Sequence, residues 1–222
     1  MSALYALGVN NVLVKMNNSE VPILDGSAKI FVDEIQKVGL KDQNAPLKFI
    51  NLPNPINYSD FESGAEILFV PANNFILSVV LDYQNPVLGT QYAEIRNLEN
   101  YPEEIAPCKT FVLLTELEKL AQANLIKGGD LQNAIVLIDR DEIKIQEIKK
   151  LAHLLGKDDT DIQVNGNVLN NCELQFFNEP ARHKLLDVIG DLALIGMPIM
   201  GHIITKKHCL LYTSDAADDL VG

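Results

Sequence analysis

The chain has 222 residues, of which 47% are hydrophobic, and a formal net charge of −12. This charge argues against sequence-independent binding of nucleic acid, because the phosphates would be repelled. The apolar content predicts a soluble globular protein with its own core, and no apolar run approaches the roughly 20 residues of a membrane span. Three cysteines without CxxC spacing, and a start without a signal-peptide pattern, indicate a reducing, cytoplasmic location.

The first 52 residues predict two helices and two strands. SALYALG (2–8) is typical of a helix end closed by Gly8, and NVLVKM (11–16) is typical of a short strand. Ser27 is placed to cap a helix over residues 28–38 that ends at Gly39. A strand is expected around residues 47–52, after a polar break at Asp42 to Pro46 that has linker composition and predicts a domain boundary.

The remainder predicts more strands than helices. Strands are expected at 65–71, 74–83, 91–98, 134–139 and 198–207, with PANN joining the first two as a hairpin-type connection. Helices are expected at 115–125, ending near Gly128 and Gly129, at 142–156, and from Asn178 or Glu179 with Pro180 in the first turn. Residues 157–171 are polar and turn-rich, which favours a surface excursion. Helices interleaved irregularly with strands predict an α+β protein built of two-layer α/β sandwiches.

The helix containing RHKLLDVIGD, residues 182–191, carries its polar residues on one narrow face. At about 100° per residue, Lys184, Asp187 and Asp191 all fall within about 100° of His183, and the apolar residues spread over the opposite side. A His and an Asp four residues apart can bind one metal ion together. The alternative is an ordinary amphipathic helix whose solvated face holds these residues.

The last fourteen residues differ in sequence character from the rest of the chain. CLLYTSDAADDLVG, residues 209–222, resembles the in-frame translation of a common transposase sequencing adapter. We therefore expect residues 208–222 to be an artefactual tail, and a genuine disordered acidic tail is the alternative. His208 would straddle the junction and is given no functional role.

Four segments together resemble the UDP-3-O-acyl-N-acetylglucosamine deacetylases, the zinc hydrolases of lipid A synthesis. The segments are EVPILDGSA (20–28), CKTFVLLTELEKL (108–120), LIKGGDLQNAIV (125–136) and NEPARHKLLDVIGDLALIG (178–196). The sequences of these segments are most similar to those of the deacetylases that are fused to a 3-hydroxyacyl-carrier-protein dehydratase. The resemblance implies a first domain truncated to residues 1–45, a nearly complete second domain at 46–207 with an excursion at about 141–171, and an active site between the two domains.

The resemblance also implies roles for individual residues. His183 and Asp187 resemble two of the three protein ligands of a catalytic Zn²⁺. Thr110 resembles the hydroxyl that helps to hold the oxyanion, Asp191 the carboxylate that orients a catalytic histidine, and Lys184 a substrate-contacting cation. Phe111 is expected to line the sugar site of the acylated UDP-sugar substrate. The expected walls of the acyl-chain passage are Leu114, Leu117, Ile126, Gly129 and Leu131, although leucines at helical spacing are also typical of a core. In EVPILDGSA, Asp25 and Gly26 are expected to form a turn.

The sequence departs from the family pattern at both ends. The Glu-His pair that supplies the general base and the third zinc ligand would lie two residues ahead of Met1. The histidine that acts as catalytic acid would fall at Leu210, inside the adapter-like segment. These departures predict that Met1 is an internal methionine or a trimmed gene edge, and that the chain is an inactive fragment of a zinc deacetylase.

Other histidines and other chemistries have less support. His153 is expected on a solvated helix face, and His202 is expected to be a strand or surface histidine. A serine or cysteine hydrolase is disfavoured, because no GxSxG is present and Cys108 has no recognisable base. The remaining alternative is a non-catalytic soluble α/β module whose His/Lys/Asp face is a solvated surface or a partner contact.

Overall fold

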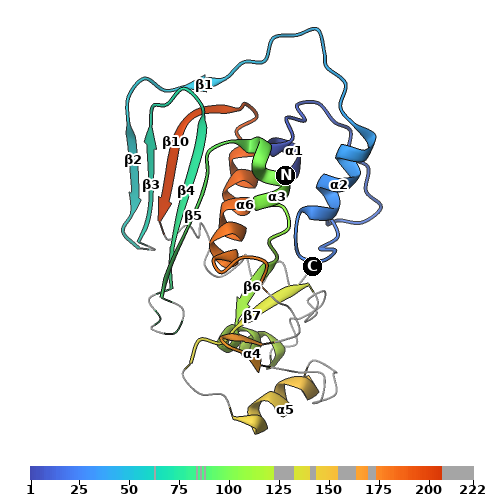
Figure 1. Ribbon diagram of the computed structural model, residues 1–222, viewed down its shortest axis with the longest axis vertical. Helices are drawn as coiled ribbons and strands as arrows, with labels where there is room; N and C mark the ends of the chain where they lie inside the picture. The colour runs from blue at the N-terminus through green and yellow to red at the C-terminus, as the bar shows by residue number, and fades with distance from the viewer. Residues whose placement is uncertain are drawn as a thin grey trace.

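A computed structural model of the chain shows two sheets of unequal size with helices packed against them (Figure 1). The structure describes residues 1–62, 64–83, 85, 87, 89–122, 133–140, 144–154, 164–169 and 174–206. Its helices, including one 3₁₀ turn (η1), are α1 (Ser2–Ala6), α2 (Lys29–Val38), η1 (Leu98–Asn100), α3 (Tyr101–Glu104), α4 (Leu114–Gln122), α5 (Ile145–Leu154) and α6 (Glu179–Ala193). None of the helices in these ranges has the length and apolar character that a bilayer crossing requires.

The larger sheet runs in the order β2-β3-β10-β4-β5, and β1 pairs in parallel with the first two residues of β10. Its strands are β1 (Ile50–Asn51), β2 (Ile56–Asp60), β3 (Ala65–Val70), β4 (Phe75–Asp82), β5 (Thr90–Ile95) and β10 (Ile199–Lys206). The β10 strand is antiparallel to β3 and parallel to β4, and all other long pairs in this sheet are antiparallel. The last described strand of the chain therefore occupies the centre of this sheet.

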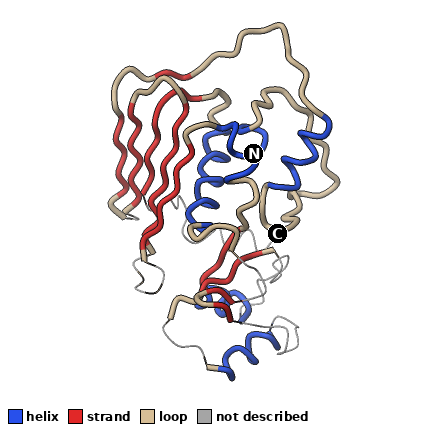
Figure 2. Tube along the Cα trace, in the orientation of Figure 1, coloured by secondary structure: helices blue, strands red, loops and turns tan. Residues whose placement is uncertain are grey.

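Helix α6 lies against one face of the larger sheet, and α1 and α2 lie on the far side of α6 (Figures 1 and 2). One apolar cluster joins these layers: it contains Leu77 of β4, Ile95 of β5, Leu185 and Ile189 of α6, and Val32 of α2, all of them almost fully buried. Helix α1 approaches α6 at Gly190, where a Cβ would lie 3.6 Å from the backbone nitrogen of Ser2, an ordinary contact distance.

The smaller sheet runs in the order β6-β7-β9-β8 and lies beyond the end of α6 (Figure 1). Its strands are β6 (Thr110–Leu113), β7 (Ala134–Leu137), β8 (Val164–Asn165) and β9 (Val168–Leu169). Successive strand residues point to opposite faces. Val112 and Val136 pack with α4 and α5 on one face, whereas Phe111 and Leu137 contribute to a cluster on the other.

The predicted α+β class with sheets packed on helices is confirmed, as are most of the individual elements. Gly39 ends α2 with a φ of 77°. Ser27 lies one position ahead of the cap residue Ala28, yet its hydroxyl still accepts a hydrogen bond from the Lys29 amide at 3.1 Å. Asn178 and Pro180 begin α6 as expected. The division into domains at residues 42–46, and the nature of residues 208–222, stay predictions; residues 207–222 lie outside the described ranges.

The predicted hairpin between β3 and β4 is wrong. The PANN turn does join the two strands in sequence, but β10 lies between them and pairs with both. Gly201, at the start of β10, lies under the ring of Phe69, where a Cβ would come within 2.1 Å of a ring carbon. A turn-like tetrapeptide between two apolar runs does not reveal that a strand about 130 residues later separates them.

Two further predictions are wrong. Residues 11–16 form no strand: Val12, Leu13 and Val14 are exposed, and no described strand lies beside them to accept their backbone hydrogen bonds. Residues 157–171 are not wholly a surface excursion, because β9 joins the smaller sheet and Leu169 is fully buried. The polar residues around NGN mark the turn between β8 and β9, and they conceal the short buried strand that follows.

Candidate metal centre

His183, in the second turn of α6, is the centre of the candidate site. Although it belongs to the polar face predicted from the sequence, only 6% of the residue is exposed. Its Nδ1 lies 2.9 Å from the carbonyl oxygen of Cys108. A carbonyl can only accept, so Nδ1 carries the proton and Nε2 retains its lone pair in the neutral ring. The interpretation of this face as an ordinary solvated surface does not describe His183.

Asp187 lies one helical turn beyond His183 and faces it. Its Oδ1 is 3.5 Å from Nε2 of His183, and its Oδ2 accepts a hydrogen bond from Nζ of Lys184 at 2.9 Å. The side chains of Asp187 and Lys184 are 24% and 14% exposed, so both are largely shielded from solvent. A lone pair on nitrogen and a carboxylate oxygen therefore converge on one point beside α6.

Strand β6 brings Phe111 to the same place. Thr110 is buried at the first position of the strand. The ring of Phe111 meets the imidazole of His183 edge-on with centroids 6.4 Å apart, and Nζ of Lys184 lies 5.7 Å from the Phe111 centroid. Tyr83, just after β4, also packs edge-on against Phe111, with ring centroids 5.8 Å apart. The structure thus brings Phe111, His183, Lys184 and Asp187 together, whereas Thr110 is placed only as the residue before Phe111 on β6.

The turn predicted at Asp25 and Gly26 is confirmed, and it contacts this site. Oδ1 of Asp25 accepts hydrogen bonds from the amide and the hydroxyl of Ser27. The carbonyl of Gly26 accepts from the Thr110 amide at 2.7 Å. A Cβ on Gly26 would lie 1.6 Å from the carbonyl oxygen of Asn133, so only glycine fits between β6 and the start of β7. EVPILDGSA and LQNAIV therefore meet at one glycine.

The donor set agrees in part with a zinc ion. Imidazole nitrogen and carboxylate oxygen are both zinc donors, and a catalytic zinc takes three protein ligands. Within the described ranges, no group of three His, Cys, Asp or Glu residues is placed to hold a metal. His183 and Asp187 therefore fit part of such a centre.

The surroundings of the pair are buried and partly anionic. Burial, with the negative charge of Glu179 as a further cause, raises the pKa of the Cys108 thiol to about 12, so that the thiol stays protonated. Burial also raises the pKa of Tyr101, whose hydroxyl donates to Oγ of Ser2 at 2.8 Å. Burial lowers the pKa of the Met1 amino group. The start of the chain packs beside α6: Ser2 accepts the hydrogen bond from Tyr101, and its backbone nitrogen lies close to Gly190.

The other predicted site residues lie apart from this cluster or outside the described ranges. Asp191 is exposed, two turns beyond His183 on α6. Leu114 and Leu117 are buried in the cluster beneath the smaller sheet, on the face away from Phe111, where they serve as core. Three further residues lie outside the described ranges: Ile126, Gly129 and Leu131. The side chain of His153 is likewise not described. The predicted role of Leu114, Leu117 and Leu131 in a passage for the acyl chain stays a prediction.

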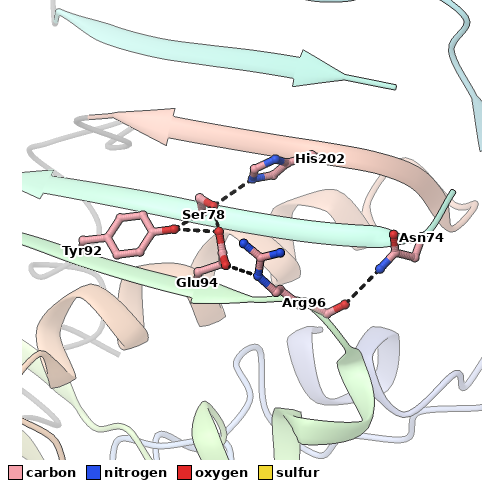
Figure 3. Close-up of polar contacts among 6 residues, drawn as sticks. All are labelled: Asn74, Ser78, Tyr92, Glu94, Arg96 and His202. Atoms are coloured by element: carbon pink, nitrogen blue, oxygen red, sulfur yellow. Dashed lines mark hydrogen bonds and ion pairs between the residues drawn. The ribbon is translucent and has the colours of Figure 1, made fainter. Parts of the chain in front are cut away.

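His202 lies in a separate polar network on the opposite face of the larger sheet (Figure 3). Its neighbours in β10, Ile199 and Ile203, face α6, so His202 points away from it. Nε2 of His202 is 2.8 Å from Oγ of Ser78, which donates to Glu94. The same carboxylate accepts from Tyr92 and Arg96, and these hydrogen bonds lower the pKa of Glu94. His202 is a strand histidine, as expected.

Sequence reasoning missed Glu179 and Tyr83. Glu179 is only 1% exposed, and its carboxylate accepts backbone hydrogen bonds from Lys109 at 2.9 Å and from Gln175 at 2.7 Å. An acidic residue beside a proline in the first helical turn is ordinarily a solvated cap, so its burial was not readable from the sequence. Tyr83 follows an apolar strand and carries no motif.

Comparison with known proteins agrees with this geometry. The family model described as LpxC, UDP-3-O-acyl N-acetylglycosamine deacetylase, matches residues 1–152 and 144–220. The bifunctional enzyme LpxC/FabZ of Bacteroides thetaiotaomicron is 44% identical over 207 residues, which are 93% of this chain and 44% of that protein. The bifunctional enzyme of Porphyromonas gingivalis is 43% identical over 204 residues, again 44% of its length.

A shorter relative gives the same result. The UDP-3-O-acyl-N-acetylglucosamine deacetylase of Chlamydia muridarum is 37% identical over 206 residues, which are 92% of this chain and 62% of that protein. The chain thus spans less than two thirds of the length of these relatives. Because the family model matches almost the whole sequence, the chain belongs to the UDP-3-O-acyl N-acetylglycosamine deacetylase family.

Proposed function

We propose that this chain carries part of the active site of a zinc-dependent deacetylase that removes the N-acetyl group from UDP-3-O-acyl-N-acetylglucosamine in lipid A biosynthesis. The observation that supports this proposal most directly is the pair of His183 and Asp187, whose Nε2 and Oδ1 atoms are 3.5 Å apart, with His183 almost fully buried. The name of a relative at 37% identity supplies the substrate class.

In this proposal five side chains have separate roles in catalysis or substrate binding. His183 offers Nε2 and Asp187 a carboxylate oxygen as two ligands to Zn²⁺, which when bound supplies a Lewis acid and lowers the pKa of a water molecule. Thr110 places a hydroxyl where the oxyanion of the attacked amide develops its charge. Lys184 holds Asp187 in place and adds a positive charge for the anionic substrate, and Phe111 provides an apolar surface beside it.

The proposal requires further groups beyond the pair. Amide hydrolysis needs a third zinc ligand, a base for the water and an acid for the leaving amine. The family pattern places a Glu-His pair two residues ahead of Met1. Residues preceding Met1 in a longer form of the protein would emerge beside α6, because Met1 and Ser2 pack against Gly190. We therefore propose that residues 1–222 alone do not deacetylate, and that residues 1–45 belong to a first domain.

Several finer features stay within the same proposal. Zn²⁺ as the metal, a cytoplasmic location, and a passage for the acyl chain that involves Ile126, Gly129 and Leu131 all follow from the family resemblance. Asp191 is proposed to orient a catalytic histidine from outside the described residues. A fused or associated acyl-carrier-protein dehydratase is supported by the names of the two bifunctional relatives.

The test is a chimera in which this chain replaces the 207 matching residues of the Bacteroides thetaiotaomicron enzyme. With zinc present, we expect the chimera to release acetate from UDP-3-O-acyl-N-acetylglucosamine. His183→Ala and Asp187→Ala should each lower kcat/KM at least about 100-fold, the upper end of what loss of an outer-shell group causes. His202→Ala, a histidine change on the opposite sheet face, should leave kcat/KM unaltered.

Two results would contradict the proposal. One is a folded chimera that binds zinc but releases no acetate. The other is a His183→Ala chimera as active as its parent. Acetate release by the purified 222-residue chain would overturn the narrower statement that this chain alone is inactive.

A further inference from the structure

Two side chains of α6 hold opposite ends of one peptide group. The carbonyl oxygen of Cys108 accepts from Nδ1 of His183 at 2.9 Å, and the next amide, that of Lys109, donates to Oε1 of Glu179 at 2.9 Å. In a planar trans peptide the C=O and N–H point in opposite directions. Glu179 and His183 are four residues apart and therefore lie on the same side of the helix. Together they fix the position and the orientation of the Cys108–Lys109 peptide.

Glu179 is unusually placed for an acidic residue. It is 1% exposed, and burial of a carboxylate is costly unless hydrogen bonds compensate for the lost water. Its second oxygen accepts from the Gln175 amide at 2.7 Å, and Nε2 of Gln175 donates to the carbonyl of Pro107 at 3.3 Å. The carboxylate thus ties the segment before α6 to the segment before β6, and it does so one residue from Thr110.

The held peptide determines which nitrogen of His183 carries the proton. With the Cys108 carbonyl fixed opposite Nδ1, the ring keeps the Nδ1–H tautomer, and the lone pair of Nε2 is directed at Asp187. A backbone carbonyl that accepts from the second ring nitrogen is a common way of orienting a metal-binding histidine. Here the carbonyl itself is oriented from the other end of its peptide.

We propose that Glu179 is a positioning residue: by holding the Lys109 amide, it keeps the Cys108 carbonyl against His183 and so sets the tautomer that leaves Nε2 available to a metal. The role in metal binding rests on the proposed function, whereas the effect on the tautomer does not. A carboxylate that served only to stabilise the start of α6 would affect the free energy of unfolding and leave the tautomer unchanged.

The experiment reads the tautomer directly. The 222-residue chain is labelled with ¹⁵N-histidine, and the ring nitrogens are observed by NMR near pH 8.5, where neutral imidazole predominates. The signal of His183 is identified by its absence in His183→Ala. We expect Nδ1–H to predominate in the parent chain. In Glu179→Gln, whose side chain presents an NH₂ group to one of the two amides, the ratio of Nδ1–H to Nε2–H should fall at least threefold.

Metal binding provides a second measurement. Cobalt(II) is titrated into the same proteins, and its visible absorption reports the ligands. We expect Glu179→Gln to weaken cobalt binding at least tenfold. Glu103→Gln, an exposed acid in the first turn of α3, is the matched control and should change neither the tautomer nor the binding.

The possible results separate the two proposals. If folded Glu179→Gln keeps both the tautomer ratio and the cobalt affinity of the parent, the inference about Glu179 is wrong and the proposed function stands. If the tautomer shifts but the parent itself binds no cobalt, the positioning effect stands and the role of the His183–Asp187 pair as ligands fails. Should Glu179→Gln not fold, Glu179→Asp, which keeps both acceptors but shortens their reach, must shift the tautomer by a smaller factor; an unshifted Glu179→Asp would overturn the inference.

Discussion

Nε2 of His183 faces Oδ1 of Asp187 at 3.5 Å, one turn apart on α6, while Nδ1 of the same ring is engaged by a backbone carbonyl. The distance is too long for a good hydrogen bond, which needs roughly 2.7–3.2 Å. This separation leaves room for a metal ion that is bound by both Nε2 and Oδ1. The histidine is also almost fully buried, so its orientation is imposed by packing.

The first prediction concerns divalent metal binding by the 222-residue chain. With two protein ligands we expect weak binding of cobalt(II) or zinc, and loss of either ligand should weaken it at least tenfold, which corresponds to about 1.4 kcal/mol. His183→Ala and Asp187→Ala are compared by titration with cobalt absorption as the readout. His202→Ala serves as the control, and binding that falls equally in this control would show that the metal binds elsewhere.

The second prediction compares two glycines with nearly the same φ angle. Gly26 and Gly39 have φ values of 78° and 77°, but a Cβ on Gly26 would meet Asn133 at 1.6 Å whereas one on Gly39 meets nothing within 4 Å. Gly39→Ala should therefore cost about 1–3 kcal/mol through backbone strain alone, because φ 77° with ψ 173° is a conformation essentially restricted to glycine. Gly26→Ala should cost at least about 1 kcal/mol more than Gly39→Ala, because overpacking against Asn133 adds to backbone strain. Urea unfolding of both variants measures the difference, and equal losses would show that the close approach to Asn133 is unimportant.

The third prediction concerns the core between α6 and the larger sheet. Leu185 is fully buried among Leu77, Ile95 and Ile189, so Leu185→Ala should lower the free energy of unfolding by about 2–5 kcal/mol. Leu194, at the end of the same helix, is 75% exposed. Leu194→Ala should therefore change the free energy of unfolding by less than about 0.5 kcal/mol. Denaturant midpoints for both variants decide the matter. A small loss for Leu185→Ala would mean that α6 is not anchored at this position.

The fourth prediction concerns alkaline pH. Burial raises the pKa of Cys108 from 9.0 to about 12, so between these values the unfolded thiol loses its proton and the folded one keeps it. The folded state then binds more protons, and stability falls as pH rises through this window, by about 1.4 kcal/mol per pH unit at most. Cys108→Ala should remove that part of the slope. Unfolding measured at several pH values from 8 to 11 tests this, and identical slopes for the two proteins would contradict it.

The sequence predicts most elements of this fold, because apolar spacing, Gly39 and Pro180 are local signals. The order of strands in the larger sheet is not local. Nothing between β3 and β4 indicates that residues 199–206 separate them, and the turn-like PANN suggested a direct pairing. The short β9 strand was likewise hidden by its polar turn, because two buried residues are too few to form a pattern.

The candidate site shows the same division. His183, Asp187 and Phe111 were found because they belong to motifs of a known family, and the structure brings these three residues together. The contribution of Glu179 was not readable, since its partners are backbone amides that any residue could supply. Backbone groups leave no trace in a sequence, so positioning contacts of this kind emerge only from the fold.

The central place of β10 has a consequence for how the protein is made. A ribosome delivers β3 and β4 long before it delivers residues 199–206, so the inner edges of both strands stay unpaired while residues 83–198 are added. Pairing across so long a stretch of chain is slow, because closing a long loop is entropically unfavourable. A nascent chain of this protein is therefore most exposed to mispairing with its neighbours just before β10 appears.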